Sequence, residues 1–126
     1  DRIAAVDGSG MTPEAHLRAV VEEILLAYRG ADDEHRVQIA AISFLPEADQ
    51  EVLRGYQRDL VREVSGILAR LAPGLAADPA ARRAATMSLF GMLNWFYMWN
   101  RDDSDAARRD YARLVTGLML GGLPRL

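Results

Sequence analysis

Sixteen consecutive residues, from Ala84 to Trp99, carry no charged side chain. They lie between a helix start at Asp78-Pro79 and a polar loop over residues 100–103. A helix on the surface of a soluble protein normally has a charged face opposite its apolar stripe. A helix without a charged face has to be covered on every side, by the rest of the chain, by a ligand or by a second copy of the chain.

A membrane span is a poor explanation of this segment. Sixteen helical residues rise only about 24 Å, whereas the hydrocarbon core of a bilayer is about 30 Å thick. Thr86, Ser88 and Asn94 make the segment less apolar, and Arg82-Arg83 directly precede it. We therefore expect no contact with a membrane.

Length and composition limit the class of protein. The chain has 126 residues, which is enough for one domain with a hydrophobic core. It has no cysteine, which excludes disulfides, thiolate metal sites and cysteine nucleophiles. Its net charge is −3, whereas binding a nucleic-acid backbone requires clustered positive charge. We therefore expect this chain itself not to bind nucleic acid.

Turn residues divide the chain into helices, and no convincing pair of strands is present. Thr12 as N-cap and Pro13 at the first helical position begin a helix that Gly30 closes. The segment over residues 32–45, which contains a nearly continuous apolar run over residues 37–45, is read as a second helix ending at Pro46. Its acidic first turn and the lack of a partner strand favour this reading, although periodicity alone is ambiguous.

Three further helices are predicted over residues 47–71, 79–100 and 104–120. Pro73-Gly74 breaks the chain after the first of them, and Gly121-Gly122 ends the last. The predicted fold is all-α, an antiparallel bundle of about five main helices. Two apolar faces follow from spacings of three and four residues. They are Leu53, Tyr56, Leu60, Val64, Ile67 and Leu71 on the helix over 47–71, and Ala107, Tyr111, Leu114, Val115, Leu118 and Met119 on the last helix.

No group of residues has the spacing of a catalytic motif or of a metal site. His16 and His35 lie on different helices, and neither has another histidine three or four residues away. The acidic residues before His35 are better explained by helix capping. There is no nucleophile elbow and no phosphate-binding glycine loop. We predict no catalytic residue, no metal and no cofactor, and we expect the protein not to be an enzyme.

Two regular patterns each have a structural and a functional interpretation. Arg54, Arg58 and Arg62 form a basic stripe that could hold the phosphates of a coenzyme A thioester. The favoured interpretation is a solvated face, because acidic residues precede two of these arginines by three positions.

Gly117 lies within the apolar pattern of the last helix, where a small residue allows two helices to approach closely. The alternative for Gly117 and Gly121 is a frayed helix end.

The uncharged helix also carries many aromatic and methionine side chains, and these extend around its whole circumference. Methionine adapts its shape, which suits a pocket for variable apolar ligands. A pocket on one face and a homodimer seam on another would together cover the helix. The set consists of Met87, Phe90, Met92, Trp95, Phe96, Tyr97, Met98 and Trp99.

The sequence LFGMLNW over residues 89–95, Trp99, and LVTGL over residues 114–118 resemble TetR-type transcriptional regulators. The resemblance is to their C-terminal, effector-binding half. It is strongest to a subgroup with an asparagine-tryptophan pair in the penultimate helix. That subgroup includes regulators of lipid, fatty-acyl and steroid metabolism. The specific part of the resemblance covers residues 84–118, and the rest agrees in the number and order of helices.

The resemblance implies a bacterial, cytoplasmic homodimer whose last two helices pair with their copies in a four-helix bundle. It implies a small apolar effector, such as a lipid, fatty-acyl or steroid-like compound, that controls DNA binding. A repressor is expected, with operator DNA bound only through an N-terminal helix-turn-helix domain. This sequence has no counterpart of that domain. We therefore expect residues 1–126 to form the ligand-binding and dimerisation domain, with residues 1–7 as the tail of the linking helix.

Helical faces suggest which residues perform each role. The predicted ligand-binding residues are Ile24, Tyr28, Phe44, Tyr56, Leu60, Met87, Phe90 and Met98. The predicted dimer interface consists of Gly91, Asn94, Trp95, Tyr111, Leu114, Gly117 and Leu118. The alternative function, from another class, is a stand-alone helical module that binds a lipid or a protein partner.

Overall fold

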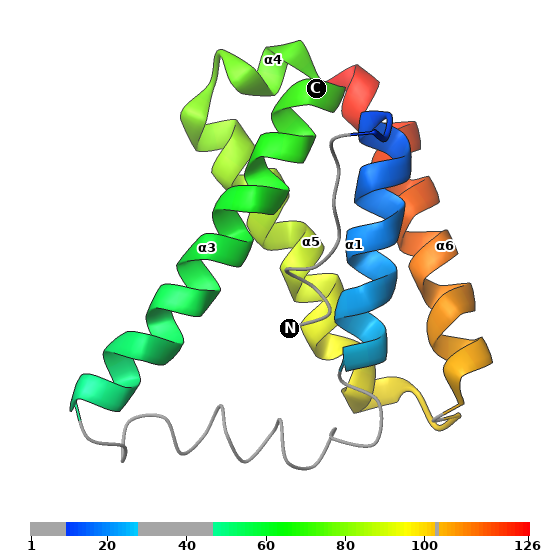
Figure 1. Ribbon diagram of the computed structural model, residues 1–126. Coiled ribbons are helices and arrows are strands. Elements are labelled where there is room, and N and C mark those ends of the chain that lie inside the picture. Colours follow the sequence, from blue (N-terminus) through cyan, green and yellow to red (C-terminus); the bar gives the residue numbers. More distant parts are fainter. Residues whose placement is uncertain (1–9, 28–46, 103) are drawn as a thin grey trace.

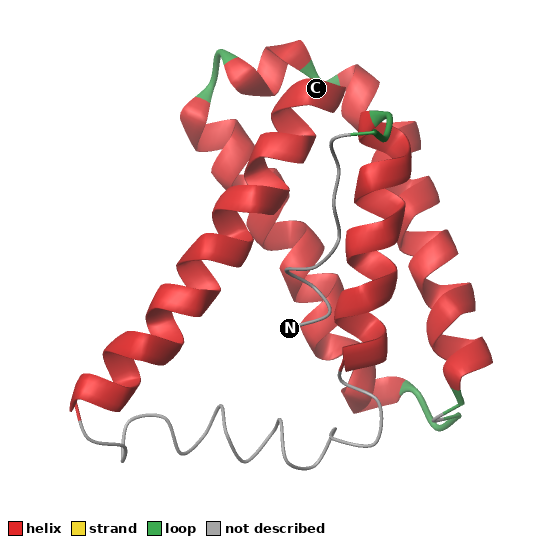
Figure 2. Cartoon of the chain, viewed as in Figure 1, coloured by secondary structure: helices red, strands yellow, loops and turns green. Residues whose placement is uncertain are grey.

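The computed structural model describes residues 10–27, 47–102 and 104–126, in which every regular element is a helix (Figures 1 and 2). The predicted all-α bundle is confirmed. The predicted helix over residues 32–45 and the tail over residues 1–7 lie outside the described residues. The elements are α1 (Pro13–Ala27), α3 (Glu47–Leu71), α4 (Pro73–Ala76), α5 (Pro79–Trp99), α6 (Asp105–Gly122) and the short 3-10 helix η2 (Leu123–Arg125).

Capping side chains set the beginnings of three helices. Thr12, Asp78 and Ser104 each accept a hydrogen bond from the backbone N–H three residues later, at 3.2, 3.1 and 3.1 Å. An N-cap of this kind stabilises a helix by about 1 kcal/mol. Pro13 and Pro79 follow two of these caps, where the missing N–H of proline costs nothing. Local chemistry therefore explains why the predicted starts agree with the observed ones.

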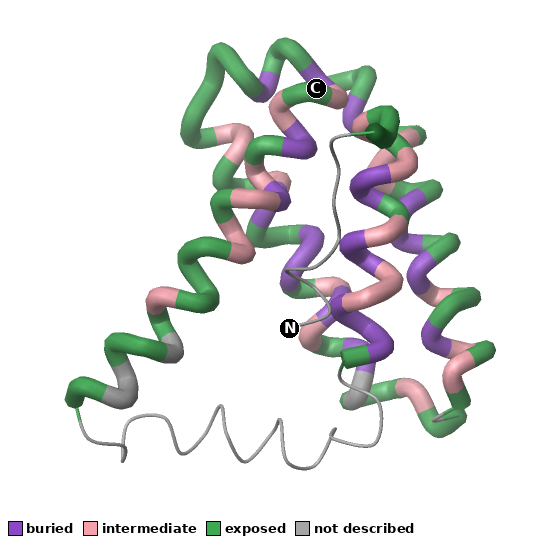
Figure 3. Tube along the Cα trace, in the orientation of Figure 1, coloured by how far each residue is buried: buried purple, intermediate pink, exposed green. Residues whose placement is uncertain are grey.

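Helix α1 lies beside α6, whereas α3 diverges from the other helices toward its N-terminal end (Figure 1). The core is formed where α1, α5, α6 and the C-terminal half of α3 meet, and burial is concentrated there (Figure 3). It includes Leu17, Val20, Val21, Ile24 and Leu25 from α1, Val64, Ile67 and Leu68 from α3, Leu89, Leu93 and Phe96 from α5, and Ala112 and Val115 from α6.

The predicted core face of α3 is correct only in its C-terminal half. Val64 and Ile67 are buried, but Tyr56 is 70% exposed, so its assignment to the core face was wrong. The N-terminal half of α3 extends beyond the other described helices (Figure 3). An apolar spacing pattern specifies a face of a helix, but it does not specify where the neighbouring helices end.

The predicted apolar face of α6 divides between two environments. Val115 is fully buried, whereas Leu114 and Leu118 are 57% and 58% exposed.

The buried side of α6 includes Arg108, which is 1% exposed, and the sequence did not predict the burial of this residue. Its guanidinium donates to the carbonyl of Leu25 at 3.2 Å and lies 5.5 Å from the centre of the Phe96 ring. These contacts compensate in part for removing the charge from water.

Across the described ranges, no helix combines the length and the apolar character needed to span a bilayer.

Candidate binding pocket and exposed apolar face

A pocket of about 880 Å³ lies between α3 and α5, and we call it the α3–α5 pocket. Pockets for small ligands commonly have volumes of about 300–1,000 Å³. Three of the eight predicted ligand-binding residues, Leu60, Met87 and Phe90, line it. The full lining consists of Arg54, Gln57, Arg58, Leu60, Val61, Arg62, Ser65, Pro79, Arg82, Arg83, Thr86, Met87, Phe90 and Asn94.

Of the other five predicted ligand-binding residues, three lie elsewhere and two are outside the described residues. Ile24 is fully buried in the core. Tyr56 and Met98 are exposed and line neither of the two pockets described here. Tyr28 and Phe44 lie outside the described residues. A contact of these five residues with a ligand stays a prediction.

The pocket has an apolar floor and a basic rim. Phe90 is only 7% exposed, and Leu60 and Val61 are half-buried. Arg58 and Arg62 at the rim are exposed, and each forms an ion pair along α3: Arg58 with Glu51 at 2.7 Å and Arg62 with Asp59 at 3.6 Å. The hydrogen bond from Arg58 lowers the pKa of the Glu51 carboxyl. The pair of Arg62 with Asp59 has the spacing of three residues expected from the sequence, whereas Glu51 pairs with Arg58, seven residues away.

Two functional features of this pocket were not predicted. Arg82 and Arg83 line it from α5, opposite the arginines of α3. Asn94, which was assigned to the dimer interface, also lines it, and its side-chain carbonyl oxygen is buried without a hydrogen-bond partner. Helical spacing on one helix cannot reveal which residues of a second helix lie opposite it. No signal in the sequence alone could have joined these groups.

A second surface is exposed and apolar, and we define the α5–α6 face as Gly91, Trp95, Leu114, Gly117 and Leu118. Trp95 is 58% exposed, like the two leucines. A Cβ atom added at Gly91 or Gly117 would meet no other described atom within 4 Å. These are five of the seven residues predicted for the dimer interface. Exposed apolar patches often mark surfaces for association.

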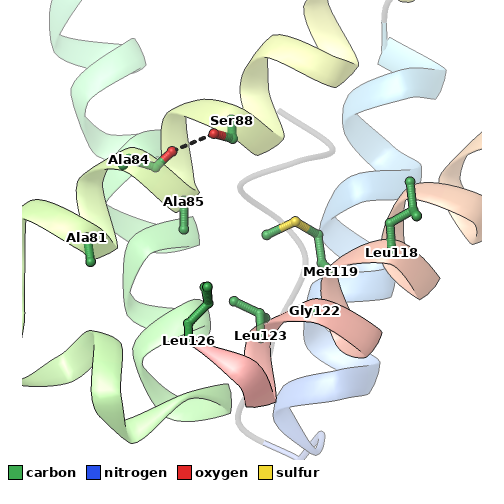
Figure 4. A pocket seen from close by; sticks show the side chains of 9 residues that line it. All are labelled: Ala81, Ala84, Ala85, Ser88, Leu118, Met119, Gly122, Leu123 and Leu126. Carbon is green, nitrogen blue, oxygen red and sulfur yellow. Dashed lines mark hydrogen bonds between the residues drawn. The ribbon is translucent and has the colours of Figure 1, made fainter.

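A smaller hollow of about 420 Å³ adjoins this face between α5, α6 and η2 (Figure 4). Small side chains on α5 form one wall, and Leu118 belongs to the opposite wall (Figure 4). The Ser88 hydroxyl donates to the carbonyl of Ala84 at 2.8 Å, so it uses its hydrogen within its own helix. The lining consists of Ala81, Ala84, Ala85, Ser88, Leu118, Met119, Gly122, Leu123 and Leu126.

Tyr111, the remaining residue predicted for the dimer interface, is half-buried within an aromatic cluster of its own chain. Its ring stacks on Phe96 at a centroid distance of 4.5 Å and meets Trp99 edge-on at 5.3 Å. Its hydroxyl donates to the carbonyl of Met92 at 3.3 Å. Burial raises the pKa of the Tyr111 phenol. A role for Tyr111 and Asn94 between two copies stays a prediction.

His16, one of the two histidines considered as metal ligands, instead links two helices. His16 on α1 is buried, and its Nδ1 lies 3.0 Å from a guanidinium nitrogen of Arg70 on α3. Its Nε2 lies 3.6 Å from a carboxylate oxygen of Glu63. In the described ranges, no cluster of three or more histidine and acidic side chains could hold a metal ion.

Comparisons with known proteins agree with this architecture. Residues 10–123 match the model of the tetracyclin repressor-like C-terminal domain. A crystal structure of a TetR-family transcriptional regulator from Bordetella parapertussis 12822 is similar over 99% of this chain, with a TM-score of 0.84 and 30% sequence identity. The chain spans 65% of the length of that regulator. No curated protein matches the chain.

Proposed function

The chain belongs to the TetR family of transcriptional regulators as one of its C-terminal domains, and we therefore propose that it is the effector-sensing and dimerisation domain of a repressor. The effector is a small, largely apolar compound of the lipid or fatty-acyl class, bound in the α3–α5 pocket. The dimer forms through the α5–α6 face. Operator DNA is bound by a separate DNA-binding domain of the full protein.

One observation carries the proposal: α5 lines the pocket and also carries the exposed face. Phe90 lines the pocket, and the next residue, Gly91, is exposed. Asn94 lines the pocket, and the next residue, Trp95, is exposed. A ligand that moves α5 relative to α3 therefore also moves the face that meets the second copy. A single rigid helix is a direct physical route for coupling the two sites.

The energy required for such coupling is modest. Burying about 200 Å² of apolar ligand surface gives about 5 kcal/mol before the costs of binding are subtracted. Only the difference in affinity between two dimer geometries shifts their populations. Typical coupling energies are about 1–3 kcal/mol. A fraction of the gross binding energy is therefore sufficient to favour one geometry.

The dimer is supported by the exposure of the α5–α6 face. Trp95, Leu114 and Leu118 together leave a large apolar area in contact with water. A two-fold arrangement would bury the same patch on both copies. The two exposed glycines would let the helix backbones approach closely. Helices α5 and α6 of each copy would then form a four-helix bundle.

The alternative, a stand-alone lipid-binding or protein-interaction module, requires the same pocket and no DNA-binding partner domain. We favour the regulator, because the matching family model and the similar crystal structure both describe TetR-type proteins.

A pair of serine substitutions tests the proposal, because Ser65 lines the α3–α5 pocket and Ser88 lines the hollow beside the α5–α6 face. Ser65→Phe should place a phenyl ring in the pocket and weaken the binding of decanol, measured by isothermal titration calorimetry, while the dimer persists. Ser88→Phe should retain decanol binding and weaken the dimer, measured by analytical ultracentrifugation. Unchanged decanol binding by Ser65→Phe would exclude the α3–α5 pocket as the effector site.

A further inference from the structure

The rim of the α3–α5 pocket is strongly basic. Five arginines line the pocket, and no aspartate or glutamate is among its lining residues. We propose that the effector is an anionic amphiphile, whose hydrocarbon part occupies the apolar floor and whose carboxylate or phosphate group binds the arginines. This inference rests on the proposed function and specifies the chemical class of its ligand. The arginines are Arg54, Arg58 and Arg62 from α3, and Arg82 and Arg83 from α5.

The arginines come from two segments that are distant in the sequence. The three on α3 are four residues apart and extend over about 12 Å of that helix. Arg82 and Arg83 lie in the second turn of α5. A solvated stripe on α3 alone would not require basic residues on the opposite wall. Their convergence on one concavity is what distinguishes a binding site from an ordinary charged helix face.

Local ion pairs do not account for the arginines of α5. Arg82 donates to the backbone carbonyl of Ala76 at 3.1 Å, which orients its side chain without neutralising its charge. In the part of the chain that the structure describes, neither Arg82 nor Arg83 forms an ion pair with a carboxylate. Two guanidinium groups at one wall of a pocket can bind a carboxylate or phosphate by charge-assisted hydrogen bonds.

The floor of the pocket determines the other half of the ligand. Leu60, Val61 and Phe90 line the pocket and are less exposed than four of its five arginines, all but Arg82 being exposed. An inorganic anion would leave this surface in contact with water, whereas an alkyl chain would cover it. The unpaired carbonyl oxygen of Asn94 can accept one hydrogen bond from a hydroxyl or amide group on the chain. The floor therefore favours an amphiphile over a free anion.

Three probes with the same ten-carbon chain test the inference on the full 126-residue chain: decanol, decanoate and decyl phosphate, each below its micellar concentration. Isothermal titration calorimetry should show at least one anionic probe binding about tenfold more tightly than decanol, and this preference should decrease as salt is added. The more tightly bound anion identifies the headgroup. Equal dissociation constants for all three probes would overturn the inference.

Arginine variants test whether anion binding depends on the arginines at the pocket rim or on the net charge of the protein. Arg83→Gln should weaken binding of the preferred anion about tenfold, a clearly larger loss than it causes for decanol. Arg18→Gln is the matched control, because Arg18 is an exposed arginine on α1 outside the pocket lining. Equal effects of the two variants would overturn the inference, since they would reflect net charge alone.

The two proposals fail in distinguishable ways. If Ser65→Phe weakens decanol binding but the anions bind no more tightly than decanol, only the anionic character of the effector is wrong. If Ser65→Phe leaves the binding of all three probes unchanged, the pocket assignment fails, and the proposed function fails with it.

Discussion

The two sides of α5 are both apolar, yet their surroundings differ. Toward α3, Phe90 is buried and lines a pocket that five arginines also line, and Asn94 has a buried polar atom. Away from α3, Gly91 and Trp95 are exposed and line neither of the two pockets. An apolar concavity that arginines also line suits a small amphiphile, whereas an exposed apolar face outside a pocket suits a second protein surface. The shape of an apolar surface and the charges that line it therefore help to indicate what covers it.

A third side of α5 faces the core, and a substitution there should have the largest effect, which is on the free energy of unfolding. Leu93 is 1% exposed, so Leu93→Ala leaves a cavity in the core. The free energy of unfolding should fall by about 3 kcal/mol. Urea denaturation at several protein concentrations would measure it. A loss below about 1 kcal/mol would mean that α5 packs less tightly than the structure indicates.

A charge on the exposed side should act on association and leave folding nearly unchanged. Trp95→Glu should raise the dimer dissociation constant about a hundredfold, because two carboxylates would be buried at the two-fold interface. Sedimentation velocity would measure this. Val52→Glu is the matched control, since Val52 is similarly exposed but lies on α3. A wild-type chain that is monomeric at micromolar concentration would refute the interface.

A smaller effect is expected where the helices of two copies approach each other. Gly117→Leu should weaken the dimer about tenfold by overpacking the close approach, while the single chain has room for the side chain. The matched control is Gly66→Leu, because Gly66 on α3 is also exposed and has no described atom near an added Cβ. If the two variants dissociate alike, Gly117 has no role at an interface.

The helices could be predicted from the sequence because their boundaries depend on neighbouring residues. Thr12 and Asp78 cap helices through hydrogen bonds to residues three positions later, and Pro79 begins α5. The absence of charge from residues 84–99 predicted that apolar residues extend around α5, and in the single chain some of these residues are buried and others exposed. That a ligand and a second copy cover the exposed ones stays a prediction. These signals lie within one or two helical turns, so they can be read without knowing the fold.

The site could be predicted only in part. Leu60, Met87 and Phe90 do line the α3–α5 pocket. The sequence did not reveal that Arg82 and Arg83 face the arginine stripe of α3, because residues on two different helices are brought together only by the fold. The exposure of Tyr56 was missed for the same reason, since it depends on how far α3 extends beyond its neighbours.

Arg108 and Leu114 on α6 illustrate the division between local and tertiary information. The sequence determines that both residues are helical, because Ser104 caps the helix that contains them. By polarity alone, the arginine would be placed in water and the leucine in the core. The fold reverses both positions: Arg108 is buried beside Leu25 and Phe96, and Leu114 is exposed. Hydrogen bonds within a helix form between residues close in the chain, whereas burial depends on helices that are distant in the sequence.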